Sequence, residues 1–467
     1  MIELRLEHKL KPIDISDVIS QSFQRPIVYY LINKNDCRKF FITFAILNFI
    51  KKEICYLFSY LPDNEKRIEE EPDNNKFSLF KVPHCTINIL DGEDFFVFMQ
   101  EEEFFIYVNY KTMIMRIYTM NDVIQNRDVN YKRFSSTFYK DDADPNYFYM
   151  SLVDEEEYIH IFRTSVTLDD IVEIDSFKGK SDPPHALRKY KNYLFLSHEF
   201  YASKYNLTKK GKIVDTEELS VIFLANETRL KQKANKLNQQ TVKNNIIEER
   251  KKLLELLEQK FSIRCVPGKI IMLDINTKNR KYYTTSGGSP AHFEIDSRTD
   301  TIYTSSHNFF NRKDSMTFVQ PAIIDKFRLV EGKLELVGSF SYEKGFRYAS
   351  HRVFYHNERP YICTFAQPNR LLFIDAEKME LLFYDDIGED ELTEVTDVST
   401  YLSSRVPGFE IVAIEVSQDE NYIMFLGPEY IYFYNFSKRK LETMLKYMDE
   451  DYLVENKLHT VHINYLY

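Results

Sequence analysis

The sequence predicts an all-β protein, a seven-bladed β-propeller with a helical insertion in one blade. Two observations carry this prediction: short strands recur with tight turns between them, and most repeats open with a similar entrance segment. Composition agrees with it, because the 467 residues include 37 Phe and 33 Tyr but no Trp. Phe and Tyr favour the half-buried surface of a pleated sheet. A chain of this length that repeats one unit indicates a large repeat architecture.

The clearest repeat runs from Val82 to Met120. Its expected strands are Thr86–Leu90, Phe95–Gln100, Phe104–Tyr110 and Met113–Tyr118. Four short strands with tight turns form one propeller blade. The stretch from Arg405 to Tyr447 follows the same plan, with Gly408 where the first repeat has His84 and a third strand at Tyr430–Phe436.

The other blades follow the same cadence along the chain. They are expected at Pro26–Leu61, from near Ser135 to Phe177, at His185–Thr284, at Ala291–Ser341 and at Ser350–Asp385. The count is then seven. The last strand, His459–Tyr467, is expected to pair into the first blade and close the ring.

One blade, which opens at His185, is interrupted. Residues 226–261 are polar and charged and carry apolar residues near helical spacing, and a blade-like strand resumes at Lys269–Asn276. We therefore expect one propeller domain over residues 1–467, with a largely helical insertion at 203–266 between the second and third strands of this blade. The insertion is either a surface or oligomerisation arm or a lid.

Charge, cysteine content and the N-terminal segment limit the partners and the cellular location that are expected for the protein. The net charge of −10 comes from interspersed residues, which disfavours nucleic acid as a partner. The five cysteines include no CxxC pair, which is typical of reduced thiols rather than of a disulfide framework. Residues 1–12 carry alternating charge and no apolar stretch, so neither a signal peptide nor a membrane span is expected. We expect a cytoplasmic protein.

Histidines recur at the entrances of the repeats and are the main candidates for function. Four of them, in Val82-Pro83-His84, Pro183-Pro184-His185, Ser289-Pro290-Ala291-His292 and Tyr348-Ala349-Ser350-His351, precede or open a first strand. First strands of all blades line the central channel, so these imidazoles are expected to converge at one mouth. Convergent neutral imidazoles suit Fe, Mn, Cu or Zn. We therefore assign His84, His185, His292 and His351 to a metal.

The ends of the second strands belong to the same mouth. In an antiparallel meander the start of the first strand and the end of the second lie at one end of the sheet. This brings His198, Glu199 and His307 to the mouth as candidate catalytic residues. His356 lies near the first turn, at the opposite end, and is excluded.

Three roles for the histidines stay open. They form a metal site, a metal-free polar pocket, or caps that a structural repeat places at each blade entrance. No phosphate-binding glycine loop, GxSxG elbow or HExxH motif is present.

The segment His185–Glu199, followed after the insertion by Lys269–Asn276, resembles the repeat of YncE-like, or YVTN-type, seven-bladed propellers. That repeat has Pro-His before its first strand and an Ile-Asp pair at the end of its third. His351–Leu382, with Phe373-Ile374-Asp375, is similar. The motifs also recur in lactonase-like and amine-dehydrogenase-like propellers. The resemblance therefore implies the fold and not a reaction.

Two metalloenzyme families on seven-bladed propellers offer analogies. Carotenoid oxygenases hold iron with four histidines from different blades, and oligogalacturonate lyases hold manganese with histidines and a glutamine. Their local motifs do not match this chain, so no catalytic residue is carried over.

Two classes of function follow from these patterns. The first is a metal-dependent enzyme, an oxidoreductase or lyase, which acts on a small organic substrate at the mouth; iron is preferred, with manganese or zinc as alternatives. The second is a metal-free interaction scaffold that binds a protein partner through one face and the insertion. Residues 226–261 could also mediate a homo-oligomer.

Overall fold

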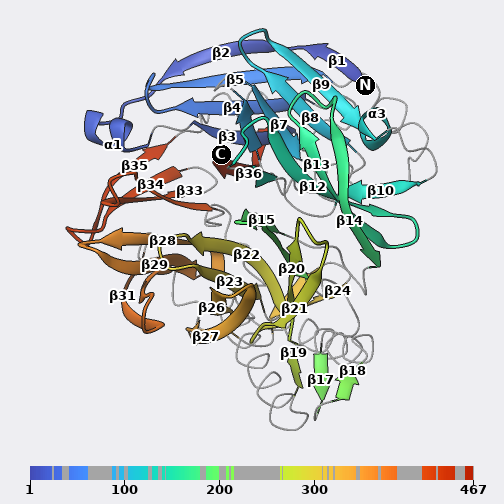
Figure 1. The fold of residues 1–467 in the computed structure, drawn as a ribbon. Coiled ribbons are helices and arrows are strands. Elements are labelled where there is room, and N and C mark those ends of the chain that lie inside the picture. The colour runs from blue at the N-terminus through green and yellow to red at the C-terminus, as the bar shows by residue number, and fades with distance from the viewer. Residues whose placement is uncertain are drawn as a thin grey trace, which may run out of the picture.

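A computed structural model describes residues 1–23, 26–33, 41–60, 87–90, 94–98, 104–124, 129–134, 139–141, 143–178, 186–198, 207–209, 212–214, 263–265, 267–307, 309–312, 315–318, 321–342, 348–366, 370–386, 413–426, 430–446 and 458–465. The described strands form seven sheets of four or five strands, arranged in a ring as a β-propeller (Figure 1). The predicted fold class is confirmed. We number the sheets as blades 1 to 7 in chain order.

Blades 1 and 2 contain the N-terminal strands. From the axis outward, blade 1 comprises β36 (Leu458–Tyr465), β3 (Ile27–Asn33), β4 (Phe41–Asn48), β5 (Glu53–Tyr60) and β2 (Glu7–Pro12). Blade 2 comprises β6 (Ile87–Leu90), β7 (Asp94–Phe98), β8 (Phe104–Asn109), β9 (Ile114–Thr119) and β1 (Ile2–Arg5). The short helices α1 (Asp17–Ser22) and α3 (Met120–Val123) follow β2 and β9.

Blades 3 and 4 each depart from the simple plan. Blade 3 comprises β10 (Tyr131–Phe134), β11 (Tyr139–Lys140), β12 (Tyr147–Asp154), β13 (Tyr158–Ser165) and β14 (Ile171–Lys178). Its first strand is split, and β10 begins four residues before the expected start at Ser135. Blade 4 comprises β15 (Leu187–Tyr190), β16 (Tyr193–His198), β20 (Lys269–Asp274) and β21 (Arg280–Thr284).

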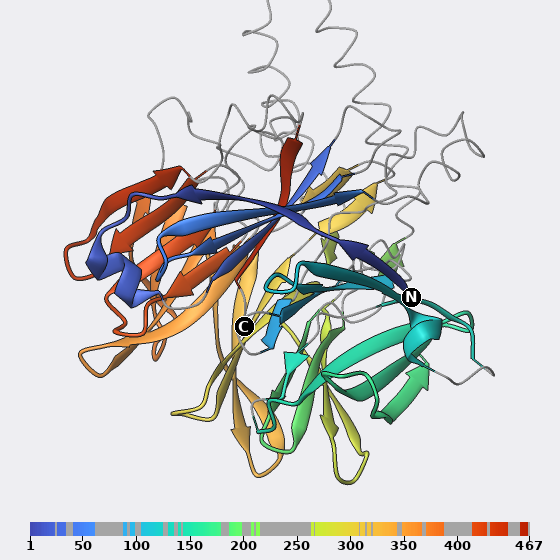
Figure 2. The same ribbon diagram turned by 90° about the horizontal axis from the view of Figure 1, so that it is seen from above.

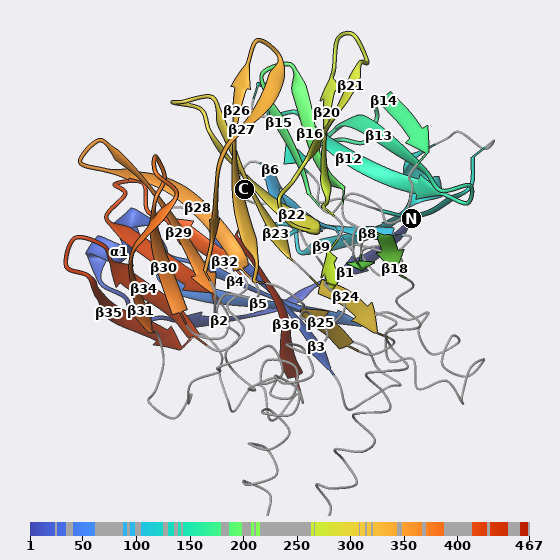
Figure 3. The ribbon, with the colours of Figure 1, turned by 90° about the horizontal axis from the view of Figure 1, so that it is seen from below.

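Blades 5, 6 and 7 are four-stranded meanders. Blade 5 comprises β22 (Ser289–Asp296), β23 (Thr301–His307), β26 (Ile323–Val330) and β27 (Lys333–Ser341), with the hairpin β24 (Phe309–Arg312) and β25 (Ser315–Phe318) between its second and third strands (Figure 3). Blade 6 comprises β28 (Tyr348–His356), β29 (Arg359–Ala366), β30 (Arg370–Asp375) and β31 (Glu380–Asp386). Blade 7 comprises β32 (Ala413–Val416), β33 (Tyr422–Leu426), β34 (Tyr430–Asn435) and β35 (Lys440–Lys446).

The last strand closes the ring, as the sequence predicted. β36 pairs antiparallel with β3, from Ile27 opposite Tyr465 to Asn33 opposite Leu458. Figures 2 and 3 show the dark red β36 beside the blue β3. Blade 1 is therefore built from both ends of the chain.

The insertion in blade 4 lies mainly outside the described residues. Since β16 pairs with β20, everything between them is an excursion from this blade. Its described parts are β17 (Leu207–Lys209), β18 (Lys212–Val214) and β19 (Ile263–Cys265), which form a small sheet. The stretch 226–261 is not described, so the largely helical insertion at 203–266 stays a prediction.

The Asp at the end of several third strands caps the turn that follows. Asp274 Oδ1 accepts hydrogen bonds from the backbone N–H of Asn276 and Thr277, at 2.9 and 3.0 Å. Asp375 Oδ1 makes the same pair of bonds in blade 6. Asp stabilises turns in this way. The repeated Ile-Asp signature is therefore a feature of the fold.

Apolar packing between blades forms the core. Phe436 at the end of β34 lies among Phe354, Tyr361 and Phe373, with ring centroids 4.9 to 5.2 Å apart, and joins blades 6 and 7. Blades 7 and 1 pack through a second cluster that includes Phe433 and Phe23. Such aromatic pairs contribute beyond the area that they bury.

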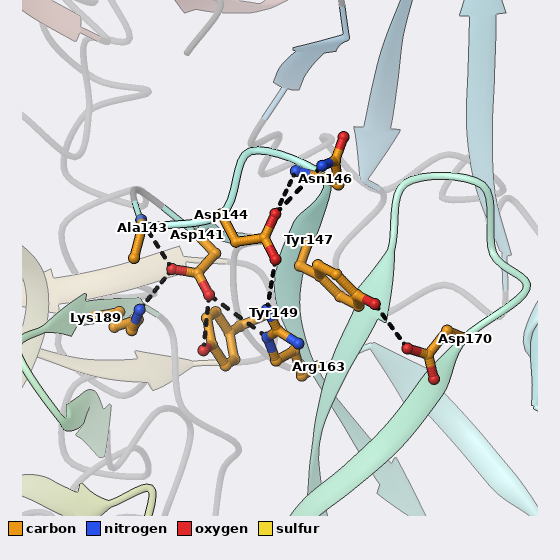
Figure 4. A network of polar contacts seen from close by, with 9 residues as sticks. All are labelled: Asp141, Ala143, Asp144, Asn146, Tyr147, Tyr149, Arg163, Asp170 and Lys189. Atoms are coloured by element: carbon orange, nitrogen blue, oxygen red, sulfur yellow. Dashed lines mark hydrogen bonds and ion pairs between the residues drawn. The ribbon is translucent and has the colours of Figure 1, made fainter.

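A polar network joins blades 3 and 4 (Figure 4). Asp141, whose side chain is 3% exposed, accepts a hydrogen bond of 2.5 Å from Lys189 Nζ on β15 and one of 3.1 Å from the Tyr149 hydroxyl. Arg163 lies 3.5 Å from the same carboxylate. Burial alone raises the pKa of Asp141, but the hydrogen bond from Lys189 and the other contacts hold it below the ordinary value. The buried carboxylate is therefore ionised and fully paired.

We expect Asp141→Asn to lower the free energy of unfolding by about 2 kcal/mol at pH 7, because it removes a charged hydrogen-bond acceptor from two cations. A depressed pKa gives stability that is present above the unfolded-state pKa and lost as the pH falls through the folded-state pKa. The difference between variant and parent should therefore shrink below about pH 4. Urea unfolding at several pH values measures it. The exposed pair of Asp17 and Lys52 supplies the control, Asp17→Asn, for which little change is expected.

Candidate functional site

The candidate site lies at the end of the blades where first strands begin and second strands end. In blade 5, Ser289 at the start of β22 pairs with His307 at the end of β23. In blade 4, Ala186 and Ser197 exchange hydrogen bonds, and His198 follows directly. The antiparallel register thus places the ends of β16 and β23 at the entrance end of their blades. We call this end the mouth.

The predicted site residues are described to different extents. His84, His185 and Glu199 lie outside the described residues. His198 and His307 are placed as the last residues of β16 and β23, but their side chains are not described. His292 and His351 are described fully, so the site can be built from blades 5 and 6.

His292 and His351 lie at the same level on neighbouring inner strands. The Tyr355 hydroxyl of β28 donates a 2.6 Å hydrogen bond to Asp296 Oδ2 of β22, which fixes the two strands relative to each other. Both strands run away from the mouth. His292 precedes Asp296 by four residues on β22, and His351 precedes Tyr355 by four residues on β28. Side chains at positions i and i+4 of a strand share one face. His292 and His351 therefore extend toward the junction between blades 5 and 6.

His351 is buried and neutral. Its side chain belongs to a residue that is 1% exposed, and Nε2 lies 3.4 Å from the backbone oxygen of Tyr303 in blade 5. Burial, together with the charge of Arg352, lowers the pKa of His351 to about 3. Its Nδ1 has no hydrogen-bond partner among the described residues. Nε2 thus faces blade 5, and Nδ1 is the ring nitrogen without a partner among the described residues.

Two buried hydroxyls belong to the same junction. Ser305 pairs with His292 in blade 5, and Thr364 pairs with His351 in blade 6. Directly opposed residues of a pair project from the same face of a sheet. Both are fully buried. We call His292, Ser305, His351 and Thr364 the mouth cluster.

A charged triad lies in the channel next to the mouth cluster. Arg352 of β28 donates a 2.6 Å hydrogen bond to Glu415 Oε1 of β32, and its other terminal nitrogen lies 3.3 Å from Glu294 Oε2 of β22. The three side chains are 16%, 9% and 21% exposed, in the order Arg352, Glu415, Glu294. Burial raises the pKa of Glu294 although Arg352 opposes that shift. The triad joins the inner strands of blades 5, 6 and 7.

A second arginine extends the series of charges. Arg188 of β15 in blade 4 lies close enough to Glu294 and His351 to lower the pKa of each. Its guanidinium also lies 5.3 Å from the centre of the Tyr139 ring. Basic and acidic residues therefore alternate over the inner strands of blades 4 to 7.

These charged residues were not among the predicted site residues. The available signal was a charged residue in the first strand of each of four successive blades, at Arg188, Glu294, Arg352 and Glu415 in turn. Their pairing crosses blades and leaves no local spacing pattern.

Other described features lie away from the mouth. His356 ends β28 at its hairpin turn and packs against the Phe436 ring, so its predicted position at the end opposite the mouth is confirmed. A hollow of about 410 Å³ lies at the rim between α1 and β35, lined by Ile15, Ile19 and Lys440 among others. Neither belongs to the mouth cluster.

Within the described ranges, no three His, Cys, Asp or Glu side chains form a group that could hold a metal ion. The ligand set His84, His185, His292 and His351 has two members outside those ranges and stays a prediction. The part of the chain that is described contains no helix long and apolar enough to cross a membrane.

No protein-family model and no curated protein sequence matches the chain. Among solved structures, it is similar to a mutant of the apocarotenoid oxygenase of Synechocystis, at 7% identity and a TM-score of 0.48, covering 95% of this chain and 93% of the other. It is also similar to a Bacteroides fragilis protein provisionally assigned as a 6-phosphogluconolactonase, at 9% identity and a TM-score of 0.45, covering 97% and 100%. A chimera of the oxygenase and RPE65 gives 8% identity and a TM-score of 0.47, covering 95% and 93%. No family follows from these likenesses, and the resemblance to YncE-like propellers stays a prediction.

Proposed function

We propose that this protein is a metal-dependent enzyme that acts on a small organic substrate at the mouth of its propeller. The observation that supports the proposal is the placement of His292 and His351 at one level on neighbouring inner strands, with Nδ1 of His351 unpartnered within the described structure. If His351 were only a structural cap at a blade entrance, both of its buried ring nitrogens should be hydrogen-bonded, because buried polar atoms normally are.

The donor set fits a divalent transition metal. A neutral imidazole is the form that ligates, and His351 stays neutral at any physiological pH because burial lowers its pKa to about 3. Arg352 would repel a cation, but Glu294 and Glu415 offset its charge. His84 and His185 are proposed as the remaining ligands, with iron preferred and manganese or zinc as alternatives. A metal held there would serve as a Lewis acid or an oxygen-activating centre.

The ends of the second strands are proposed to act on the substrate. β16 and β23 reach the mouth at His198 and His307, and Glu199 follows His198 in the sequence. Imidazole and carboxylate groups at such a position can move protons to or from a bound molecule. The charged triad of Arg352, Glu294 and Glu415, next to the mouth cluster, gives that molecule polar groups to contact.

Metal analysis tests the proposal. Protein purified without chelators, and protein supplemented with iron, manganese or zinc, should hold stoichiometric metal. The double variant His292→Ala, His351→Ala should bind it at least about 10-fold more weakly. His356→Ala is the matched control, since His356 lies on the same strand at the far end, and it should bind metal as the parent does.

Circular dichroism of the double variant separates lost ligands from lost folding. If the unaltered protein holds no stoichiometric metal even after supplementation, the proposal is wrong. Equal metal binding by a folded double variant contradicts it as well.

A further inference from the structure

The junction between blades 5 and 6 contains two buried polar atoms that lack partners within the described structure. One is Nδ1 of His351, and the other is Oγ of Ser305, which is 0% exposed. Leaving a buried donor or acceptor unsatisfied costs about 1–3 kcal/mol. Two such atoms at one junction indicate that something else binds there.

Strand geometry brings the two atoms to the same space. Ser305 pairs with His292, so its side chain lies on the face of blade 5 that carries Glu294 and Asp296 and faces blade 6. His351 extends from blade 6 toward blade 5, where Nε2 approaches the Tyr303 oxygen. Tyr303 is two residues from Ser305 on β23. The Ser305 hydroxyl and the His351 imidazole therefore lie at the same junction, from opposite blades.

The proton on His351 can be assigned from its contact. A carbonyl oxygen only accepts hydrogen bonds, so the approach of Nε2 to the Tyr303 oxygen requires the proton on Nε2. Nδ1 is buried and has no acceptor for a second proton among the described residues, so it carries a lone pair. Metal-binding histidines typically donate their other ring N–H to such a carbonyl, which fixes the ring and its tautomer.

We infer that His351 ligates the metal through Nδ1, and that the Ser305 hydroxyl holds the same metal or its bound water from the opposite blade. This inference rests on the proposed function. A lone pair and a hydroxyl oxygen both suit a cation between them. Ser305 then acts as a positioning residue that ties the metal site to blade 5.

Thr304 provides the matched control. It is the neighbour of Ser305 on β23, is equally buried, and also has a hydroxyl without a partner among the described residues. It pairs with Phe293, which packs toward blade 4, so its side chain faces the other junction. Thr304→Ala therefore removes a similar hydroxyl from the face of blade 5 that is turned toward blade 4 and away from His351.

Zinc titration of metal-free protein carries the first part of the test, with competition by a chelator as the readout. Ser305→Ala should weaken Zn²⁺ binding about 10-fold, and Thr304→Ala should leave it unchanged. Equal weakening by both variants, or none by Ser305→Ala, overturns the inference, because the Ser305 hydroxyl would then have no specific role in holding the metal.

Nitrogen NMR of histidine-labelled protein carries the second part. Metal-free protein should show His351 with its proton on Nε2, assigned by the loss of that signal in His351→Gln, and Zn²⁺ should then shift the Nδ1 resonance. A proton on Nδ1, or a Zn²⁺ shift confined to other histidines, overturns the inference but leaves the proposed function standing. Failure of the unaltered protein to bind any metal overturns both.

Discussion

Replacing Arg352 by methionine is expected to lower the free energy of unfolding by about 3–5 kcal/mol at pH 7. The change removes the cation of the channel triad and leaves Glu294 and Glu415 with one negative charge each in a region that is mostly buried. Breaking a buried pair in this way costs more than the pair itself contributes, because an uncompensated charge remains. Urea unfolding followed by fluorescence measures the loss.

The loss should also depend on pH with a definite sign. Burial already raises the pKa of Glu294, and the variant lacks the guanidinium that opposes this shift. The folded variant therefore binds protons more readily than its unfolded chain does. Stability that comes from a raised pKa is present below the unfolded-state value and is lost as the pH rises. The variant should therefore recover stability relative to the parent as the pH is lowered toward the ordinary pKa of a Glu carboxyl.

Lys438→Met provides the control for this variant. Lys438 makes a hydrogen bond of 2.5 Å to Glu442, but on an exposed hairpin, and little change is expected there. A loss for Arg352→Met no larger than that of the control would show that the triad is not buried as described. A variant that becomes less stable toward pH 5 would contradict the sign.

Deleting residues 456–467 is expected to remove about 5 kcal/mol or more, which is comparable with the whole net stability of a domain. This deletion takes away β36, the innermost strand of blade 1, and leaves the inner edge of β3 unpaired. The ring then has a gap that faces the central channel. We expect a broad, low thermal transition by calorimetry and increased binding of hydrophobic dyes.

Deleting residues 1–5 is the matched control. It removes β1, which pairs through four residues with β9 at the outer edge of blade 2 and does not line the channel. The loss should be much smaller than for β36. Equal effects of the two deletions would mean that ring closure contributes nothing beyond one strand's pairing.

The sequence alone was sufficient to predict the bounds of strands that are joined by tight turns. The strand predicted at Tyr430–Phe436 is Tyr430–Asn435 in the structure, and the strand predicted at Phe104–Tyr110 is Phe104–Asn109. The closing strand, predicted at His459–Tyr467, is Leu458–Tyr465 in the structure. Each of these signals is local, so one sequence can reveal it.

The two N-terminal strands, β1 and β2, which lie at the outer edges of blades 2 and 1, were not predicted. β1 and β2 contain Glu3, Glu7 and Lys9, and such charged segments lack a core pattern. They form strands because an exposed edge offers backbone hydrogen bonds regardless of side-chain type. Tertiary context supplied what the local sequence did not.

The site shows the same limit. Antiparallel geometry correctly gathers strand entrances and exits at one end, but it does not give the direction of a side chain around the channel. His351 points between two blades, against the Tyr303 oxygen, rather than along the axis. The partners of Arg352 come from two other repeats, 58 and 63 residues away, and no spacing rule connects them.

The pairing of β36 with β3 also sets the order in which the molecule can be completed during synthesis. β3 ends at Asn33 and its partner begins at Leu458, so the ribosome adds more than 400 residues between them. At about 5–20 residues per second this takes roughly 20–85 s. For that time the inner edge of β3 is an open template for strand addition by any nearby chain. We therefore expect chaperones to hold this nascent chain until its last strand emerges.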